Sequence, residues 1–270
     1  MNARKIAIAL LSITLIACSE SDVSFETIMS SDHRTSDQVR DQYRKPNVTL
    51  EFFDVQPNHT VVEIWPGGGW YTRILAPYLK DKGQLYAAHF DKDSSVEFFK
   101  RSRRSFEQDL QELADVYGNV TVTTFHPPEQ VDIAPAGSAD RVLTFRNVHN
   151  WYMRGGGDEK VLAAFKAFYK TLKPGGLLGV VDHRLPEDMP AEAMNASGYM
   201  HQSYVIAMAE RAGFKLLEAS ELNANPADTA DHPKGVWTLP PNLRLGEEDK
   251  EKYQSIGESD RMTLKFVKPE

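Results

Sequence analysis

The sequence predicts an α/β protein with a doubly wound, mostly parallel sheet of seven strands and a helical extension before it. Short apolar segments alternate along the chain with longer segments of helical polarity. A glycine-rich turn, VVEIWPGGGW at residues 61–70, joins the first of these strands to a helix. Strands that alternate with helices form a parallel sheet with helices on both faces, so these observations indicate a Rossmann-like fold.

The individual elements follow from the local hydrophobic pattern. The predicted strands cover residues 60–64, 84–90, 120–125, 141–145, 177–182, 215–222 and 261–267. The predicted helices cover residues 70–78, 96–117, 160–172 and 199–212, and residues 35–44 also have helical polarity. Pro174 ends the third of these helices, because proline cannot continue a helix.

The turn at residues 67–69 has the composition of a loop that binds a nucleotide-type ligand. Glycines let the backbone approach a ligand closely, and the following helix begins with unpaired N–H groups. Thr72 stands where a dinucleotide loop would have its third glycine, which disfavours NAD. The sequence also lacks the phosphate-loop, α/β-hydrolase and zinc-protease motifs. A nucleoside sulfonium is the remaining candidate, and a loose loop without a ligand is the alternative.

The same residues resemble the first motif of the class I S-adenosylmethionine-dependent methyltransferases, an apolar strand followed by an acidic residue and a Gly-x-Gly-x-Gly loop. Glu63, Gly67 and Gly69 match this motif, while Trp65 stands in the place of its first glycine. Further along, AGSADRVLTFRNVHNW and FKAFYKTLKPGGLLGVVD resemble the fourth strand, a helix, a Lys-Pro-Gly-Gly turn and the fifth strand of that family. The resemblance spans roughly residues 46–269. It is strongest to an uncharacterised family of predicted bacterial methyltransferases with a lipoprotein-type signal peptide.

The resemblance implies S-adenosylmethionine as cofactor, a final strand antiparallel to the fifth, and an N-terminal extension lying over the cleft. Members of the family place one acidic residue after the second strand for the ribose and another after the third for the adenine. This chain has His89 and Asp91 at the first place and Phe125-His126 at the second. The segment Arg146-Asn147-Val148 also resembles the quinone C-methyltransferases. The implied cofactor-binding residues are Glu63, Trp65, Gly67, Gly68, Gly69, His89, Asp91, His126, Arg146 and Asn147.

Histidines gather at the carboxyl ends of the predicted strands, where open α/β sheets bind ligands. Four of the eight histidines lie there, namely His89, His126, His149 and His183. A methyl transfer needs a general base only when the acceptor must lose a proton. We expect His149, after the fourth strand, and His183, after the fifth, to be the candidate bases. A metal at this edge is a third interpretation, for which the sequence alone assigns no ligands.

Composition and charge limit the partners. With 270 residues, 41% hydrophobic and 26% charged, the chain can form a full hydrophobic core. Removing residues 1–17 leaves 29 basic against 38 acidic side chains, a net charge of −9. This charge argues against nucleic acid as a partner and favours a small, neutral or cationic substrate.

The N-terminus predicts export. Arg4 and Lys5 precede the apolar run Ile6 to Ile16, which is too short to span a bilayer and has the form of a signal-peptide core. The run ends in Leu-Ile-Ala-Cys18, which resembles the bacterial lipoprotein signal, and Cys18 is the only cysteine. Membrane attachment through a lipid on Cys18 is therefore expected, with Ser19 favouring the outer over the inner membrane. A soluble periplasmic protein is the alternative if Cys18 carries no lipid.

The sequence predicts three segments and leaves two alternative functions open. Residues 1–17 form the signal peptide, 18–45 a tether and helical extension, and 46–270 the methyltransferase-like domain. The leading hypothesis is an exported, lipid-anchored enzyme that methylates a small molecule. The alternative is a non-catalytic ligand-binding protein on the same scaffold, which Trp65, His89, His126 and the export signal favour.

Overall fold

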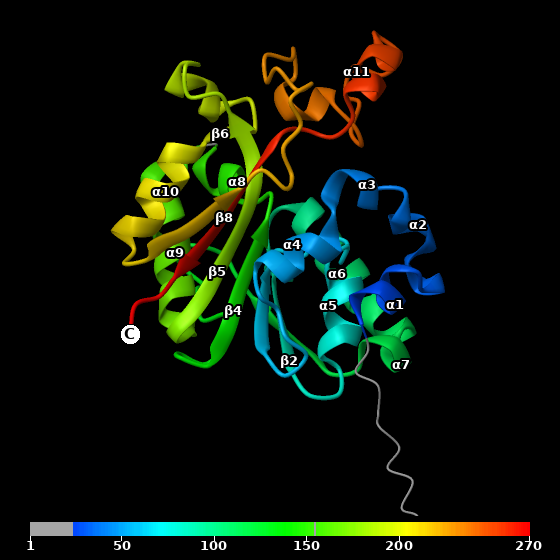
Figure 1. The fold of residues 1–270 in the computed structure, drawn as a ribbon, viewed down its shortest axis with the longest axis vertical. Helices are drawn as coiled ribbons and strands as arrows, with labels where there is room; N and C mark the ends of the chain where they lie inside the picture. The colour runs from blue at the N-terminus through cyan, green and yellow to red at the C-terminus, as the bar shows by residue number, and fades with distance from the viewer. Residues whose placement is uncertain (1–23, 154) are drawn as a thin grey trace, which may run out of the picture.

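A central sheet lies between two layers of helices in the computed structural model, which describes residues 24–153 and 155–270 (Figure 1). The main path of the sheet has the order β3-β2-β1-β4-β5-β8-β7, and β6 pairs with β5 off this path. The strands are β1 (Thr60–Ile64), β2 (Gln84–His89), β3 (Val120–Thr124), β4 (Ala139–Phe145), β5 (Leu172–Leu185), β6 (Met200–His201), β7 (Lys215–Ser220) and β8 (Arg261–Val267). The predicted α/β class and seven-stranded, Rossmann-like order are confirmed.

The strands of the path are parallel with one exception. The pairs β1–β2, β1–β4, β2–β3 and β4–β5 are parallel. Strand β8 runs antiparallel to both β5 and β7, as the family resemblance implied. Four parallel neighbours, β2, β1, β4 and β5, therefore end at one edge of the sheet, where ligands bind in such folds.

The helices before and between the strands differ in detail from the prediction. The helices that precede the sheet are α1 (Phe25–Met29), η1 (Asp32–Arg34), α2 (Thr35–Gln38), α3 (Asp41–Arg44) and α4 (Pro46–Phe52). Those after β1 are α5 (Thr72–Leu79), α6 (Glu97–Glu112), α7 (Ala114–Tyr117), α8 (Val148–Tyr152), α9 (Gly157–Thr171), η2 (Ala191–Asn195), α10 (Gln202–Arg211), η3 (Gly235–Thr238) and α11 (Lys250–Ile256). The predicted helix over 96–117 is divided at Leu113, and the segment 35–44 forms two short helices. Strand β5 begins before the predicted residue 177, because Leu172 already pairs with Ala139 of β4. The register shifts across the Lys-Pro-Gly-Gly segment, in which Gly175 has a φ angle of 73°.

Alternating side chains of the strands pack into two cores, one on each face of the sheet. Val62 and Ile64 pack with residues of α9 and α10, whereas Val61 packs with residues of α4 and α5. Figure 1 shows α9 and α10 on one face, with α4 and α5 on the other. Gly179 of β5 is tightly enclosed, because an added Cβ would lie 2.7 Å from the ring of Phe53. This packing fixes the positions of the strand ends.

The described part of the chain contains no helix with both the length and the hydropathy needed to cross a membrane. The predicted signal peptide, Cys18 and Ser19 lie outside the described residues.

Candidate functional site

A cavity of about 760 Å³ lies at the carboxyl ends of β1, β2, β4 and β5. Its walls come from the turn after β1, the segments after β2 and β4, the end of β5, the N-terminal extension and the segment after β7. Eight predicted site residues line it: Glu63, Trp65, Gly67, Gly68, Arg146, Asn147, His149 and His183. Gly69, His89, Asp91 and His126 lie outside its lining.

The glycine turn leaves open space toward the cavity. A Cβ added to Gly67 or Gly68 would meet no atom within 4 Å. Gly67 and Gly69 have φ angles of 60° and 76°, which side-chain-bearing residues rarely adopt, so both are needed for the turn itself. Gly69 instead faces Phe106, whose ring would lie 3.2 Å from an added Cβ. A ligand can thus approach the backbone at Gly67 and Gly68.

Glu63 is a buried carboxylate at the end of β1. Its exposed fraction is 2%, and its Oε2 accepts a hydrogen bond of 2.6 Å from the hydroxyl of Thr72. Burial raises the pKa of Glu63 to about 7, although the Thr72 hydrogen bond and the charge of Arg73 act in the opposite direction. Glu63 therefore changes charge near neutral pH, inside the cavity wall.

Trp65 is held in place by its indole and by neighbouring rings. Its φ angle of 46° is unusual for a large side chain, and its Nε1 donates to the carbonyl of Phe125 at 2.8 Å. The Trp65 ring lies 4.8 Å from Phe90 and 6.0 Å from Phe99, whose rings are themselves stacked 4.4 Å apart. Trp65, Phe90 and Phe99 all line the cavity, so its side near β2 is an aromatic wall.

His89 occupies the place where the family resemblance implied a ribose-binding acid, but its side chain is turned toward the glycine loop. The N–H of Phe90 donates to His89 Nδ1 at 2.7 Å, so Nε2 carries the proton and donates to the Gly67 carbonyl at 3.0 Å. Burial lowers the pKa of His89 to about 4, which keeps the ring neutral. His89 supports the shape of the glycine turn.

Asp91 and His126 point to local partners. The carboxylate of Asp91 accepts from the N–H of Asp93 and from Gln130. His126 has a 42% exposed side chain and lies 3.7 Å from Glu129. The roles that the resemblance implied for these two residues stay predictions.

His149 forms a buried pair with Asp182 at the ends of β4 and β5. Asp182 accepts two backbone N–H groups, those of His149 at 3.1 Å and His183 at 2.8 Å. It therefore acts as an acceptor toward the His149 ring as well, and His149 Nδ1 donates to it at 2.9 Å. This fixes the tautomer in which His149 Nε2 has a free lone pair, as a general base requires.

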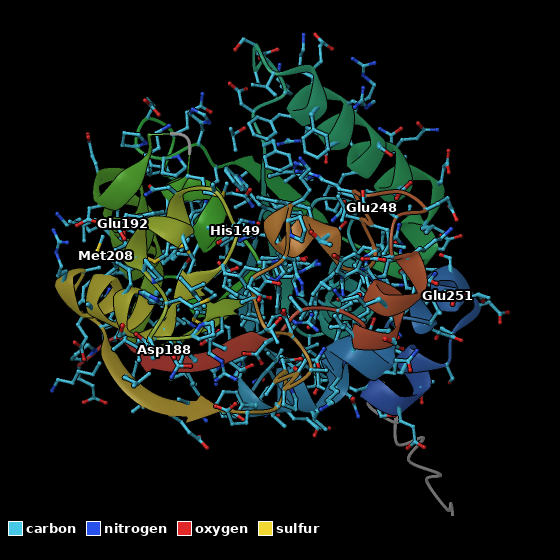
Figure 2. The ribbon with its side chains drawn as sticks, turned by 90° about the horizontal axis from the view of Figure 1, so that it is seen from above. His149, Asp188, Glu192, Met208, Glu248 and Glu251 are labelled. Atoms are coloured by element: carbon cyan, nitrogen blue, oxygen red, sulfur yellow. The ribbon has the colours of Figure 1, made fainter. Side chains whose placement is uncertain are left out.

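Two neighbours complete this part of the site. Asn147 donates its side-chain N–H groups to the Ile64 carbonyl at 2.8 Å and the Thr144 hydroxyl at 3.2 Å, which ties the ends of β1 and β4 together. Figure 2 shows His149 near the middle of the molecule, and Trp237 lies 6.2 Å from its ring.

His183 lies beside His149, with ring centroids 5.1 Å apart. Its Nδ1 is hydrogen-bonded to the Ser259 hydroxyl, and burial lowers its pKa well below the usual value. His149, Asp182 and His183 each offer an atom within 4.8 Å of the others and could hold a metal ion. The Asp182 oxygens, however, already accept three hydrogen bonds, so the arrangement fits an oriented histidine better than a ligand set.

The sequence did not identify the basic side of the cavity. Its lining contains five arginines against two acidic residues: Arg40, Arg44, Arg73, Arg146 and Arg244 against Asp37 and Glu63. The helical polarity of residues 35–44 was the only available signal for Arg40 and Arg44, and the expected position of this extension over the cleft agrees with the structure. The overall negative charge had favoured a neutral or cationic substrate, whereas the cavity itself is basic.

Solved structures share this fold, although comparisons of sequence find no match. No protein-family model matches the sequence, and no curated protein matches it either. A SAM-dependent methyltransferase from Aquifex aeolicus superposes with a TM-score of 0.57 at 15% identity, over 91% of this chain and 99% of its own. A putative sarcosine dimethylglycine methyltransferase from Galdieria sulphuraria gives 0.59 at 13% identity, over 92% of each chain. The chain has the class I methyltransferase fold.

The methyltransferase fold does not by itself set the reaction. The cyclase SpnF superposes with a TM-score of 0.53 at 12% identity, over 84% of this chain and 80% of its own. Function must therefore be argued from the residues of the cavity.

Titration of Glu63 should appear in the pH dependence of stability. Its folded pKa of about 7 exceeds the ordinary value of 4.5, so the folded state keeps a proton that the unfolded state loses. Stability should fall as pH rises from about 4.5 to 7, by up to about 3 kcal/mol. Glu63→Gln keeps an acceptor for Thr72 and should remove this loss, so its Tm should exceed that of the wild type at pH 8 by more than at pH 4.

Exposed Glu248 provides the control for this comparison, because Glu248→Gln should leave the pH profile of Tm unchanged. Parallel wild-type and Glu63→Gln profiles between pH 4 and 8 would contradict the assigned burial effect.

Proposed function

We propose that this protein transfers a methyl group from S-adenosylmethionine to a small molecule. One observation carries the proposal: the open backbone at Gly67 and Gly68 faces the same cavity as the carboxylate-oriented base His149. The volume of about 760 Å³ is in the range of small-molecule and cofactor sites.

The residues of the cavity fit the cofactor in three ways. Gly67 and Gly68 form a cradle that side chains would fill. The aromatic wall of Trp65, Phe90 and Phe99 offers ring faces to an adenine. Glu63 would meet the ammonium group of the amino-acid part. When bound, S-adenosylmethionine would supply an electrophilic methyl group.

His149 would act on the acceptor. Because the Nδ1–H of His149 donates a hydrogen bond to Asp182, its Nε2 can take a proton from the methyl acceptor, which then becomes a nucleophile. Asp182 fixes the ring orientation and stabilises the imidazolium that forms. Neutral His183, next to it, would contribute a hydrogen bond to the acceptor rather than a charge.

A non-catalytic ligand-binding protein is the second candidate, and His89 is the observation that favours it. His89 bonds to the glycine loop at the end of β2, and Asp91 is absent from the cavity lining. The ribose hydroxyls therefore lack the carboxylate partner that the resemblance implied. A protein of this kind would keep the cavity without the methyl donor.

We further propose that the protein is exported and anchored to a bacterial membrane by a lipid on Cys18, in the outer rather than the inner membrane. The LIAC segment and the basic, apolar N-terminus support this. The lipid would hold the domain on a polar tether beginning at Ser19.

Binding of the cofactor product tests the first proposal. Isothermal titration with S-adenosylhomocysteine should give saturable binding, and Gly68→Val should weaken it at least about tenfold, since the new side chain occupies the cradle. Glu248→Gln, a change at an exposed residue outside the cavity lining, should bind like the wild type. No binding by folded wild-type protein would favour the second candidate.

A base at His149 predicts a specific kinetic pattern once an acceptor is found. His149→Gln should lower kcat by about 10²- to 10⁴-fold and leave S-adenosylhomocysteine affinity within a factor of about two. Asp182→Asn should also lower kcat, because it no longer enforces the tautomer. An unchanged kcat in His149→Gln would remove the base from the mechanism.

Metabolic labelling with an alkyne fatty acid in a Gram-negative host tests the anchor. The wild-type chain should incorporate the label and sediment with outer membranes, and Cys18→Ser should lose both properties. Ser19→Asp should redirect a lipidated protein to the inner membrane. An unlabelled wild-type chain in the soluble periplasmic fraction would contradict lipidation.

A further inference from the structure

The side of the cavity near β4 and β5 gathers more positive than negative charge. Four arginines lie around a single carboxylate, that of Glu258: Arg40 just before α3, Arg44 at the end of α3, Arg146 after β4 and Arg261 of β8. Burial alone would raise the pKa of Glu258, but the arginine charges outweigh burial and lower it to about 2. One ionised carboxylate thus faces four guanidinium groups.

Arg40 and Arg44 both bond Glu258 through Nε, which leaves terminal guanidinium nitrogens of both side chains available. Glu258 accepts from Nε of Arg40 at 2.6 Å and from Nε of Arg44 at 3.2 Å. Both terminal nitrogens of Arg44 and Nη2 of Arg40 are buried and have no hydrogen-bond partner among residues 24–153 and 155–270. The Arg44 side chain is only 2% exposed, and Arg44 lines the cavity. Unsatisfied buried donors of this kind need an acceptor.

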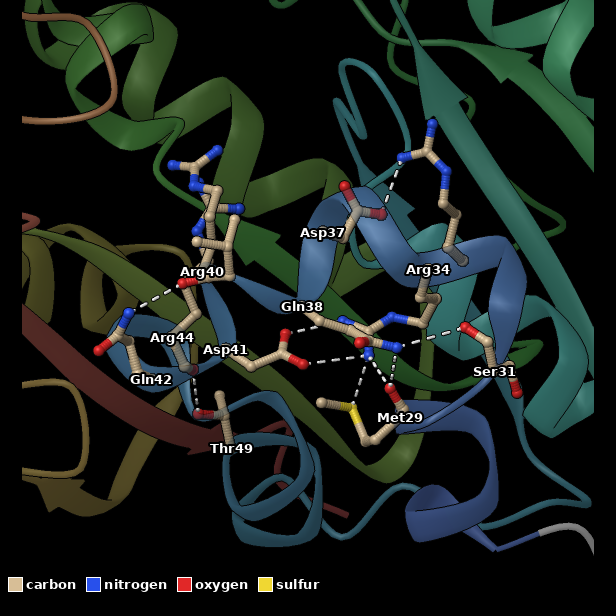
Figure 3. A network of polar contacts seen from close by, with 12 residues as sticks. Met29, Ser31, Arg34, Asp37, Gln38, Arg40, Asp41, Gln42, Arg44 and Thr49 are labelled. Atoms are coloured by element: carbon tan, nitrogen blue, oxygen red, sulfur yellow. Dashed lines mark hydrogen bonds and ion pairs between the residues drawn. The ribbon is translucent and has the colours of Figure 1, made fainter.

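Neighbouring groups hold Arg44 in position and add a further donor. Its guanidinium lies over the ring of Trp70, 4.5 Å from the centroid, and Trp70 also lines the cavity. Trp70 Nε1 is likewise buried and has no hydrogen-bond partner in the part of the chain that the structure describes. Arg34, by contrast, is paired with Asp41 at 2.8 Å, as Figure 3 shows. The unused polar atoms of Arg40, Arg44 and Trp70 are all donors, which matches an anion.

Arg146 extends this donor set toward the histidines. It has a φ angle of 63°, and its side chain makes no hydrogen bond to any residue that the structure describes. Burial and the charge of Arg261 lower its pKa to about 10 against the effect of Glu258. A second cavity of about 90 Å³ has Arg40, Arg146, His183, Ser259 and the carboxylate-bearing Glu258 in its lining. It is large enough for a few waters or a small oxyanion.

We propose that Arg40, Arg44 and Arg146 form an anion subsite that binds a carboxylate or phosphate group of the methyl acceptor. The subsite lies on the side of β4 and β5, next to His183 and the candidate base His149, whereas the aromatic wall lies on the side of β2. Arginine forks bind planar carboxylates and phosphates through two parallel hydrogen bonds. The identification of this anion as part of a methyl acceptor rests on the proposed methyl transfer. The anion site itself can be tested without that reaction.

Quenching of tryptophan fluorescence tests the subsite, because Trp65, Trp70 and Trp237 line the cavity. The purified protein should bind inorganic phosphate or benzoate saturably. Arg44→Gln and Arg146→Gln should each weaken that binding about tenfold or more, the size expected for charge-assisted hydrogen bonds. Two variants are needed because Arg44 also bonds Glu258, whereas the Arg146 side chain makes no hydrogen bond to a described residue that its removal would break.

Arg73→Gln is the matched control. Arg73 lines the same cavity but is paired with Asp37 at 3.3 Å and Asp109 at 3.1 Å, so it offers no free charge. Its variant should keep anion affinity within a factor of about three. An equal loss in Arg73→Gln, or the lack of saturable binding of both anions by folded wild-type protein, would overturn the proposal.

The carboxylate of the methyl donor is the other source of such an anion, and two ligands separate the sources. S-adenosylhomocysteine has that carboxylate, and 5′-methylthioadenosine lacks it. The proposal expects Arg146→Gln to leave the affinity ratio of these two ligands unchanged while anion binding falls. If the variant selectively weakens S-adenosylhomocysteine, the arginines hold the donor and the acceptor assignment is wrong. If the protein binds neither S-adenosylhomocysteine nor 5′-methylthioadenosine but still binds the anions, the proposed methyl transfer is wrong and the anion subsite stands.

Discussion

Parallel pairing of four neighbouring strands is the constraint on which this site depends. Because β2, β1, β4 and β5 run in one direction, their carboxyl ends meet at the same edge. The glycine turn, Arg146, His149 and His183 come from distant parts of the sequence and still line one cavity. Asn147 reinforces the edge by bonding the last carbonyl of β1 from its position after β4. Buried cores on both faces hold the strand ends in place.

The electrostatics of the cavity differ from those of the whole molecule. The formal net charge of the chain is −7, yet its cavity is lined by five arginines and two acidic residues. Burial raises the pKa of Glu63, one of those two, to about 7, so this side chain is only partly ionised near neutral pH. Net charge describes how a protein meets polymers and surfaces at long range, whereas a small ligand responds to the few groups it touches. An acidic protein can therefore recognise an anionic molecule.

The order of the fold could be predicted from sequence because each strand is a short apolar segment and each junction has its own turn residues. The glycine turn and His149 were predicted for the site for the same reason, since both follow a strand directly. The arginine cluster could not be predicted in this way. Arg44 and Glu258 are 214 residues apart, and their contact exists only once β8 has inserted beside β5. The side-chain direction of His89 was equally hidden, since sequence position does not show that it bonds Gly67.

A crystal structure of the protein with S-adenosylhomocysteine would test the central claim most directly. The account predicts the amino-acid part of the ligand over Gly67 and Gly68, and its adenine against the rings of Phe90 and Phe99. It also predicts that the thioether sulfur faces His149. A ligand bound elsewhere, or crystals that stay free of it at saturating concentration, would contradict methyl transfer at this site.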